Sequence, residues 1–370
     1  MKLKDFFCDI FDYHGDKITD PGAIKDRPDP RDFKWDEFSP QYAPFDWSRG
    51  YDVESVLQKR LSNPTFALPV KDQGNTSSCG GQAWGNFGGV VESLATATFE
   101  ERSAKFIYSQ TYVNTPGGGS AGRDNCQLVQ KQGWGLESLT PSYENGSIPT
   151  EGFMRRSQDI TDPARQRASE ATAISYANAG NDIDSVAQAM AANSGIIIGV
   201  TGINNGTWRS ENVIPPTQVQ LNSGFTFRHW LYAGKAALLP NGKRAIKIFN
   251  SWGKNVGANG WQWLDEDYFK GDMVFSSWTL IYNQKVVVPS SFKYQFQVNM
   301  QYGERSEEVK MLQTALQTLG HFPSSLNPTG FYGNVTANGV YKFQVSRGIS
   351  TPDRNHAGPK TRSVLNEIFK

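Results

Sequence analysis

The stretch of sequence at residues 68–94 reads LPVKDQGNTSSCGGQAWGNFGGVVESL, and the rest of the chain can be interpreted from it. Its first residues are strand-like, and the run of Gly, Asn and Ser that follows is typical of a turn. After the turn, apolar residues recur at steps of three and four: Trp84, Phe87, Val91 and Leu94. This spacing predicts a helix over 83–95, and Cys79 lies where the loop becomes that helix.

Cys79 has two interpretations at this junction. The N-terminus of a helix carries roughly half a positive charge, which favours the thiolate, the form of cysteine that attacks carbonyl groups. A neighbouring protonated imidazole favours the thiolate further. A lone cysteine is also often a small buried apolar residue, although burial does not require a polar approach loop. This segment alone leaves the two interpretations about equally supported.

A nucleophilic thiol needs a base. The chain has four histidines: His14, His229, His321 and His356. Only His229 lies in the middle of the chain, where it can serve Cys79 without help from another domain. It occurs in the strand-like SGFTFRHWLYAGKAAL, a context in which a histidine is more often a buried structural residue than a base.

A strand-like IKIF segment ends at Asn250, 21 residues after His229. The side-chain amide of Asn250 can accept the imidazole N–H and fix the ring tautomer, which is the third role in a catalytic triad. Trp252 is large enough to cover that hydrogen bond. The alternative is that NSWG at 250–253 is only a turn that ends a strand.

Composition excludes several classes of function. A formal net charge of +1 gives no general argument for nucleic acid or an anionic membrane as partner. No apolar run of about 18 residues occurs, so no membrane span is expected. The N-terminal MKLKDFFCDIFDYHGDK is interrupted by aspartates and offers no small-residue cleavage site, so no secretory signal is expected.

The cysteines lie at 8, 79 and 126, which are too few and too scattered for a disulfide framework. Whether Cys8 and Cys126 pair is left open. No CxxC pair indicates structural zinc, and no metal or cofactor is expected.

The 370 residues are enough for two or three domains. Helical patterns such as 182–193 lie mostly before strand patterns such as 194–200 and 244–249, which favours an α+β domain with segregated halves. We expect four regions: an N-terminal extension at 1–45 that drapes over a neighbour, this α+β domain at 46–288, a linker at 289–297 and a small all-α unit at 298–370.

The small unit has apolar residues at helical spacing. They are Val309, Leu312, Leu316 and Leu319, then Val340 and Phe343, with a third short helix expected near 360–369. Eight Lys or Arg against five Asp or Glu make it mildly basic. That charge fits a module that meets an anionic polymer, and a solvated surface explains it equally well.

Residues 46–288 resemble the papain-like cysteine peptidases, because Gln73, Cys79, His229 and Asn250 occur in that family's order. The similar segments are PFDWS at 44–48, VKDQGNTSSCGGQAW at 70–84, FIYSQ at 106–110, SGIIIGV at 194–200 and NSWGKNVGANGW at 250–261. The resemblance implies a helical lobe bearing Cys79 and a β-barrel-like lobe bearing His229 and Asn250. Substrate would lie extended between the lobes.

Gln73 precedes Cys79 by six residues, as in the family. The resemblance implies that its amide and the Cys79 backbone N–H form an oxyanion hole, worth roughly 3 to 4 kcal/mol per donor. Three positions depart from the family: Thr76 replaces a disulfide cysteine, Gly80 an aromatic residue and Val256 a tryptophan. These departures resemble a divergent bacterial or viral branch.

The resemblance also bears on substrate binding. GGGSAG at 117–122, with Gly118 and Gly119, would supply the backbone edge that pairs with substrate. Arg228 would lie near the primed side and favour an acidic substrate group, or else form a surface salt bridge. The extension is too short for a full inhibitory propeptide, and whether it covers the cleft is left open.

Residues 298–370 resemble a three-helix peptidoglycan-binding domain. The matching segments are GERSEEVKMLQTALQTLGHF at 303–322, TGFYGNVTANGVYKFQVSRGI at 329–349 and AGPKTRSVLN at 357–366. Metalloprotease prodomains share this fold but end in a zinc-binding cysteine, which this unit lacks. The resemblance implies peptidoglycan as a partner, while a protein-docking or structural role stays open.

Together these features predict a cysteine endopeptidase that works through a thiolate–imidazolium pair and an acyl-enzyme and is directed to the bacterial cell wall. Its substrates would be peptidoglycan cross-bridges or wall proteins, and it would act at the wall or outside the cell. A phage lysin or virion-associated lysin would account for the missing signal. Two alternatives are a catalytically silent wall-binding protein, against which the intact quartet argues, and an acyltransferase that uses the same site.

Overall fold

The computed structural model describes two compact units. The large unit comprises Met1–Trp35 and Tyr42–Leu280, and the small unit comprises Asp36–Gln41 and Ile281–Lys370. The described residues are 22–29, 32–37, 39, 42–114, 117–171, 173–221, 226–271, 273–282, 292–323, 326–349 and 352–369, with the backbone of β1 (Ile10–Phe11) and β2 (Lys17–Ile18). Cys8, His14 and residues 289–291 of the predicted linker lie outside them.

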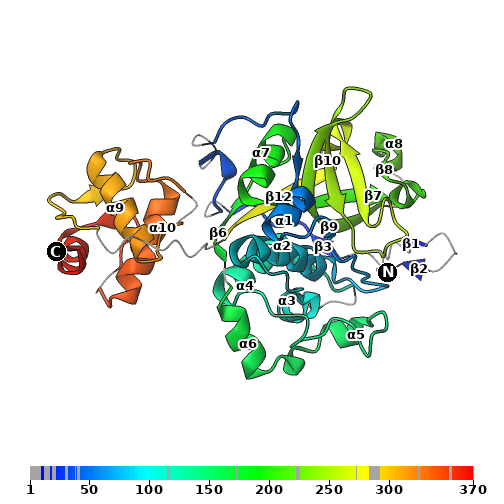
Figure 1. The fold of residues 1–370 in the computed structure, drawn as a ribbon, viewed down its shortest axis with the longest axis horizontal. Helices are drawn as coiled ribbons and strands as arrows, with labels where there is room; N and C mark the ends of the chain where they lie inside the picture. Colours follow the sequence, from blue (N-terminus) through cyan, green and yellow to red (C-terminus); the bar gives the residue numbers. More distant parts are fainter. Residues whose placement is uncertain are drawn as a thin grey trace, which may run out of the picture. The chain divides into compact units, whose positions relative to one another are not determined.

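The helices of the large unit gather mainly on one side of its strands (Figure 1). They are α1 (Val53–Arg60), α2 (Cys79–Thr96), α3 (Ala104–Thr111), α4 (Gly122–Lys131), α5 (Glu151–Met154), α6 (Asp162–Ser169), α7 (Ile183–Asn193) and α8 (Gln218–Leu221). Short 3-10 turns are η1 (Trp35–Glu37), η3 (Ser157–Asp159), η4 (Thr207–Arg209) and η5 (Glu266–Phe269). Side-chain caps start several helices, as when Asp182 accepts the Ser185 N–H at α7.

The glycines of α2 allow the helix to pack closely on its neighbours. A Cβ atom on Gly81 would lie 2.3 Å from the Ala104 carbonyl oxygen of α3, and one on Gly88 would lie 2.3 Å from the Trp134 ring. A Cβ on Gly80 would meet Ser120 and Asn125, so the aromatic residue expected from the family does not fit there. The glycines therefore lower the helix propensity of α2 but allow its neighbours to approach closely.

The strands form an eight-stranded sheet in the order β6-β12-β7-β9-β10-β11-β8, with β4 also paired to β9. They are β4 (Tyr51–Asp52), β6 (Ala173–Asn178), β7 (Ile196–Ile203), β8 (Asn212–Val213), β9 (Thr226–Leu238), β10 (Arg244–Phe249), β11 (Trp261–Asp265) and β12 (Val274–Tyr282). Helix α2 packs on β9 through Trp84 against Trp230 and Phe87 against Tyr232, with ring centroids 5.5 and 5.7 Å apart. This contact joins the helical lobe to the sheet lobe, as the α+β prediction requires.

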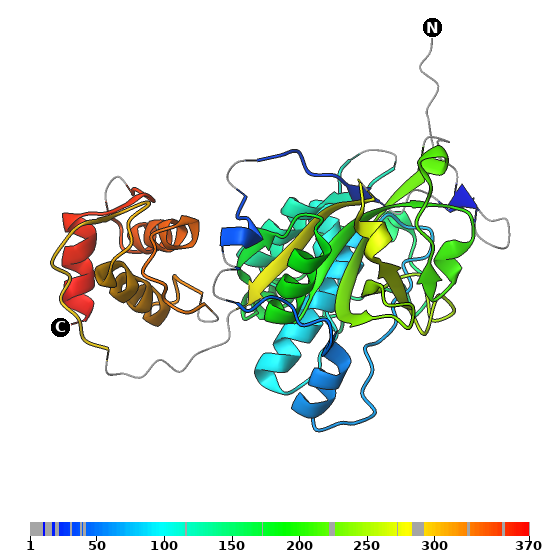
Figure 2. The ribbon, with the colours of Figure 1, turned by 90° about the horizontal axis from the view of Figure 1, so that it is seen from above.

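The described part of the extension lies along the large unit (Figure 2). Strand β3 (Ala23–Ile24) pairs in parallel with β5 (Ser120–Ala121). Phe33 and Trp35 are buried, and the Trp35 indole donates to Gln188 of α7 at 2.9 Å. Arg123 of α4 fastens the segment by contacting Asp26, Asp32 and the carbonyl of Arg27.

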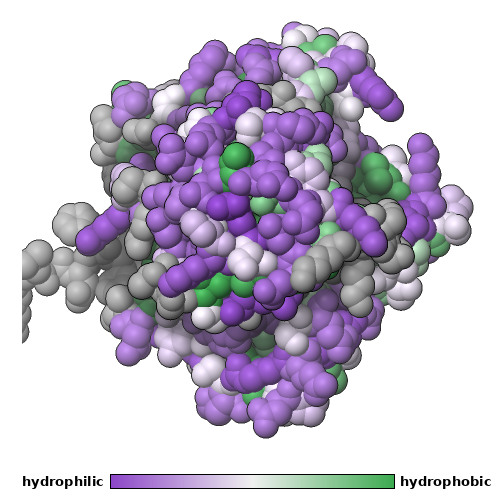
Figure 3. All heavy atoms as spheres, turned by 90° about the vertical axis from the view of Figure 1, so that its left-hand side faces the viewer, coloured by the Kyte–Doolittle hydropathy of each residue, from purple (hydrophilic) through white to green (hydrophobic). Residues whose placement is uncertain are grey.

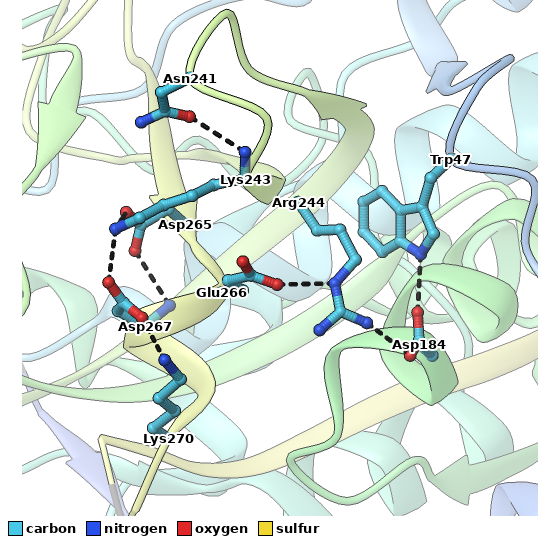
Figure 4. A network of polar contacts seen from close by, with 9 residues as sticks. All are labelled: Trp47, Asp184, Asn241, Lys243, Arg244, Asp265, Glu266, Asp267 and Lys270. Atoms are coloured by element: carbon cyan, nitrogen blue, oxygen red, sulfur yellow. Dashed lines mark hydrogen bonds and ion pairs between the residues drawn. The ribbon is translucent and has the colours of Figure 1, made fainter.

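A network of charged side chains joins α7, β10 and η5 on the surface of the large unit (Figure 4). Arg244 contacts Glu266 and Asp184 at 2.7 Å each, and Asp184 also accepts the Trp47 indole N–H at 2.6 Å. Lys243 pairs with Asp265 and Asp267. Because these groups are largely solvated, their ion pairs add little to stability, and the network mainly holds the chain near Trp47 in place.

The small unit contains α9 (Glu307–Thr318), α10 (Asn334–Ser346) and α11 (Pro359–Ile368). Its core includes the predicted residues Val309, Leu312, Leu316, Val340 and Phe343, all fully buried. Beside the three predicted helices, two short strands, β13 (Met300–Gln301) and β14 (His356–Ala357), pair antiparallel. They bring the start of the unit to the residues just before α11.

One face of the molecule is shown in Figure 3, where hydrophilic residues predominate and hydrophobic ones occur as small separate spots. Among the described residues, no helix is both long and apolar enough to cross a bilayer.

Candidate active site

Cys79 is the first residue of α2, at the predicted loop-to-helix junction. Its side chain is fully buried, and the backbone N–H of Trp230 donates to Sγ at 3.5 Å. Trp230 directly follows His229 in β9. The packing of α2 on β9 therefore brings the thiol and the predicted base, 150 positions apart in the chain, to one place.

His229 and Asn250 are joined by a hydrogen bond of 2.9 Å between Nε2 and Oδ1. An amide oxygen only accepts, so Nε2 carries the proton and donates. The other ring nitrogen, Nδ1, is buried and has no hydrogen-bond partner. Trp252 stacks on the imidazole, with ring centroids 4.7 Å apart and planes 25° apart, which shields the ring from water.

Burial strongly favours the neutral form of this imidazole. It lowers the pKa of His229 to about 4, against the opposing effect of the Asn250 hydrogen bond. An imidazolium at this position therefore needs a negative charge close by to compensate for lost hydration. A Cys79 thiolate, formed by proton transfer to His229, would supply that charge.

Gln73 is buried and bound to the turn that follows Asn250. Its backbone N–H donates to the Ser251 carbonyl at 2.8 Å, and its Oε1 accepts from Ser251 Oγ at 2.7 Å. Its Nε2 donates to the Thr76 carbonyl at 2.6 Å. An amide nitrogen has two N–H groups, and Thr76 takes one of them. The role of Gln73 as an oxyanion donor stays a prediction.

The backbone edge at Gly118 and Gly119 is already engaged in this structure. The Gly119 N–H donates to the Tyr108 hydroxyl at 3.0 Å, and its carbonyl accepts from Val113 at 2.9 Å. The next residue, Ser120, donates its N–H to the carbonyl of Gly22 at 2.9 Å. The extension thus occupies the edge beside these glycines, and their contact with substrate stays a prediction.

Arg228 is exposed and lies on the opposite face of β9 from His229, because successive side chains of a strand alternate. Its guanidinium lies 5.9 Å from the ring centroid of Phe275, which also packs against Trp230. Arg228 is therefore not directed at the imidazole. Its predicted preference for an acidic substrate group stays a prediction.

Gln262 is a residue of the site that the sequence did not reveal. It is fully buried in β11, and its Oε1 accepts from Asn250 Nδ2 at 2.8 Å. The only available signal was an amide between Trp261 and Trp263 in a strand-like segment. Only the pairing of β10 with β11, which sets Phe249 opposite Trp261, places that amide beside Asn250.

The described residues contain no group of three or more His, Cys, Asp or Glu arranged to hold a metal ion. Neither Cys79 nor Cys126 is in a disulfide bond. Burial raises the pKa of Cys126 well above its usual range, so this second thiol stays protonated.

The small unit has a pocket of about 170 Å³. Its lining residues are Tyr302, Gln313, Phe322, Leu326, Asn327, Thr329, Phe331, Gly333, Asn334, Val335 and Thr336. Among these, the aromatic side chains of Tyr302 and Phe331 are 48% and 40% exposed. Apolar walls with a few polar groups are typical of a ligand site.

Comparison with solved structures identifies proteins of similar fold. The large unit resembles xylellain, a cysteine protease from Xylella fastidiosa, with a TM-score of 0.55 and 20% identity over 76% of this chain and 98% of that one. It also resembles procathepsin B S9 from Trypanosoma congolense, with a TM-score of 0.55 and 9% identity over 71% of this chain and 86% of that one. At these identities the likeness establishes the fold alone, and that fold is papain-like.

Residues 305–365 match the sequence model of a family described as putative peptidoglycan binding domain. No curated protein matches the chain. The chain therefore combines a papain-like unit with a peptidoglycan-binding type of domain.

Proposed function

We propose that this chain, with its papain-like fold, is a cysteine endopeptidase directed to the bacterial cell wall. One observation carries the proposal: Cys79, His229 and Asn250 meet in a buried site where His229 Nε2 is bound to Asn250 and Nδ1 has no partner. A ring nitrogen without a proton, beside a thiol at a helix N-terminus, is the arrangement that thiol activation requires.

In the proposed reaction, His229 takes the proton of the Cys79 thiol, and Sγ attacks the carbonyl carbon of a peptide bond. The Cys79 backbone N–H and the free N–H of the Gln73 amide stabilise the oxyanion. His229 then gives its proton to the leaving amine, and the C–N bond breaks to leave a thioester. Water hydrolyses this thioester with His229 as base, which restores the thiol.

The wall as the place of action is supported by the small unit. Its sequence matches a peptidoglycan-binding family, and its pocket presents two exposed aromatic residues. A domain that holds the wall raises the local concentration of wall peptides around the peptidase. We propose peptidoglycan cross-bridges or wall-bound proteins as substrates, with a phage lysin as one form of such an enzyme.

The test is digestion of purified cell wall and of casein, with the products identified by mass spectrometry. The intact protein is expected to release peptides with new termini, and Cys79→Ala is expected to release none. A thiol-directed epoxide should label residue 79 in the intact protein. Undiminished cleavage by Cys79→Ala would rule the proposal out. A free amine added to the digestion would appear in the products if the acyl-enzyme transfers to amines rather than water.

A further inference from the structure

The amide of Gln262 has a fixed orientation. Its Nε2 donates to two backbone carbonyls, of Trp208 and of Ser210, at 2.8 Å each. Carbonyl oxygens can only accept, so the side chain cannot turn its oxygen toward them. The Oε1 atom therefore points the other way, toward Asn250, in a place that water does not reach.

This orientation determines that of Asn250. The Asn250 Nδ2 group donates to Gln262 Oε1 at 2.8 Å, so Oδ1 faces the opposite side. There it accepts the Ser251 N–H at 2.8 Å and the His229 Nε2 proton at 2.9 Å. With Nε2 protonated in the neutral ring, Nδ1 is the nitrogen left without a proton.

We propose that Gln262 is a positioning residue that selects, through Asn250, the His229 tautomer in which Nδ1 can take the Cys79 proton. Two fixed carbonyls orient Gln262, Gln262 orients Asn250, and Asn250 orients the imidazole. Gln262 itself contacts neither His229 nor Cys79 by a hydrogen bond in this chain of contacts. The link to turnover rests on the proposed peptidase function, whereas the tautomer follows from the contacts alone.

The variant that tests this role is Gln262→Met, which keeps the length of the side chain and removes its hydrogen bonds. Asn250 Nδ2 then becomes a buried donor without an acceptor, so rotation of the Asn250 amide is favoured. We expect kcat on a soluble peptide to fall roughly tenfold to a hundredfold, with KM changed by less than about twofold. Gln262→Glu, kept protonated by burial, retains an acceptor for Asn250 and should recover much of the loss.

Gln344 provides a matched control in the small unit. It is also buried, its Nε2 donates to the His356 carbonyl and to Thr361 at 2.9 Å each, and its Oε1 accepts the Asp353 N–H at 2.6 Å. Gln344→Met removes the same set of hydrogen bonds from a place unrelated to Asn250. We expect it to lower stability and to leave both kcat on the soluble peptide and the His229 tautomer unchanged.

The decisive measurement is the ¹⁵N spectrum of the histidine rings at neutral pH, in which protonated and bare ring nitrogens have separate shifts. With four histidines in the chain, the spectrum of His229→Gln identifies the His229 signals. In the Cys79→Ala background, where no thiol can give its proton to His229, the ring should show a protonated Nε2 and a bare Nδ1. Adding Gln262→Met to that background should shift this balance toward the other tautomer or a mixture, and Gln262→Glu should restore it.

An unchanged His229 tautomer in folded Gln262→Met would overturn the proposal, even if kcat fell, because the effect would then be structural. Absence of peptide cleavage by the intact protein would count against the proposed function instead. In that case the ¹⁵N spectra still decide the role of Gln262, so the two failures can be told apart.

Discussion

At the scale of single residues, the site depends on a histidine that the fold keeps neutral. His229 is fully buried under Trp252, and burial outweighs the favourable hydrogen bond from Asn250. A neutral imidazole is ready to act as a base, but the protein must hold it without its hydration. That requirement couples the protonation of His229 to the stability of the large unit.

The stability of the protein should therefore depend on pH through His229. Its pKa is about 4 in the folded chain and near 6.5 when unfolded, so between these values the unfolded state binds a proton that the folded state does not. The free energy of unfolding should fall by up to about 3 kcal/mol from pH 6.5 to pH 4 relative to His229→Gln. Denaturant titrations of both proteins at several pH values measure the difference. Parallel pH profiles, or a rise toward acid, would contradict it.

At the scale of elements, the glycines of α2 decide how closely helix and neighbours approach. Gly81 faces the backbone of α3, whereas a Cβ on Gly89 would meet its nearest atom, in Phe99, at 3.4 Å, an ordinary contact. Both residues lie in the same helix and both would gain helix propensity as alanine. Because their surroundings differ, alanine should change the free energy of unfolding in opposite directions at the two positions.

Gly81→Ala should lower the free energy of unfolding by about 1 to 3 kcal/mol, because the added carbon overlaps the Ala104 carbonyl. Gly89→Ala should raise it by up to about 1 kcal/mol through helix propensity. Chemical denaturation of the two variants beside the parent protein compares them directly. Equal effects would mean that close packing does not account for the glycines of α2.

One arginine of α4 makes the charged contacts that help to hold the extension to the large unit. Arg123 binds Asp32 through two guanidinium nitrogens and also forms an ion pair with Asp26. All three side chains are mostly buried. Arg123→Ala should speed hydrogen exchange of residues 22–29. Gly22 packs against Ser77, which lies two residues before Cys79. Arg123→Ala should therefore also speed labelling of Cys79 by a small thiol reagent.

Arg156→Ala is the control for Arg123→Ala. Arg156 pairs with Glu144 and Asp159 on the same unit and contacts no described residue of the extension. Its removal should leave both the hydrogen exchange of residues 22–29 and the labelling rate unchanged. If Arg123→Ala behaves in the same way, the extension is held by its strand pairing and apolar contacts instead.

At the scale of the whole molecule, the proposed peptidase site and the proposed wall-binding pocket lie in separate compact units. Each has its own core, so a surface change in the small unit should not alter the site around Cys79. Binding to the wall and cleavage of a soluble peptide are therefore separable properties of one chain.

Replacing Tyr302 and Phe331 together by alanine should reduce retention of the full chain on purified sacculi at least about tenfold, since exposed aromatic residues often dominate binding. Tyr341→Ala removes an aromatic side chain of similar exposure that does not line the pocket, and it should be retained like the parent. Co-sedimentation in the Cys79→Ala background prevents digestion during the assay. Equal retention of the pocket variant and the parent would place wall binding elsewhere.

The elements whose signals are local could be predicted from the amino-acid sequence. Helical spacing after Cys79 and before residue 193 gave α2 and α7, and the strand patterns gave β7 and β10, to within a few residues. The order of Cys79, His229 and Asn250 predicted the papain-like fold. These features could be predicted because periodicity and turn chemistry act between near neighbours.

The contacts between these elements depend on the assembled fold. Gln262 reaches Asn250 through the register of two strands, Arg228 points away from His229 through the pleat, and Gly22 takes the edge at Ser120. The spacing of residues along the chain does not reveal these arrangements, because each depends on strand pairing that exists only once the sheet is assembled. The candidate nucleophile could be read from the sequence, whereas the protonation and the covering of its candidate base depend on the fold.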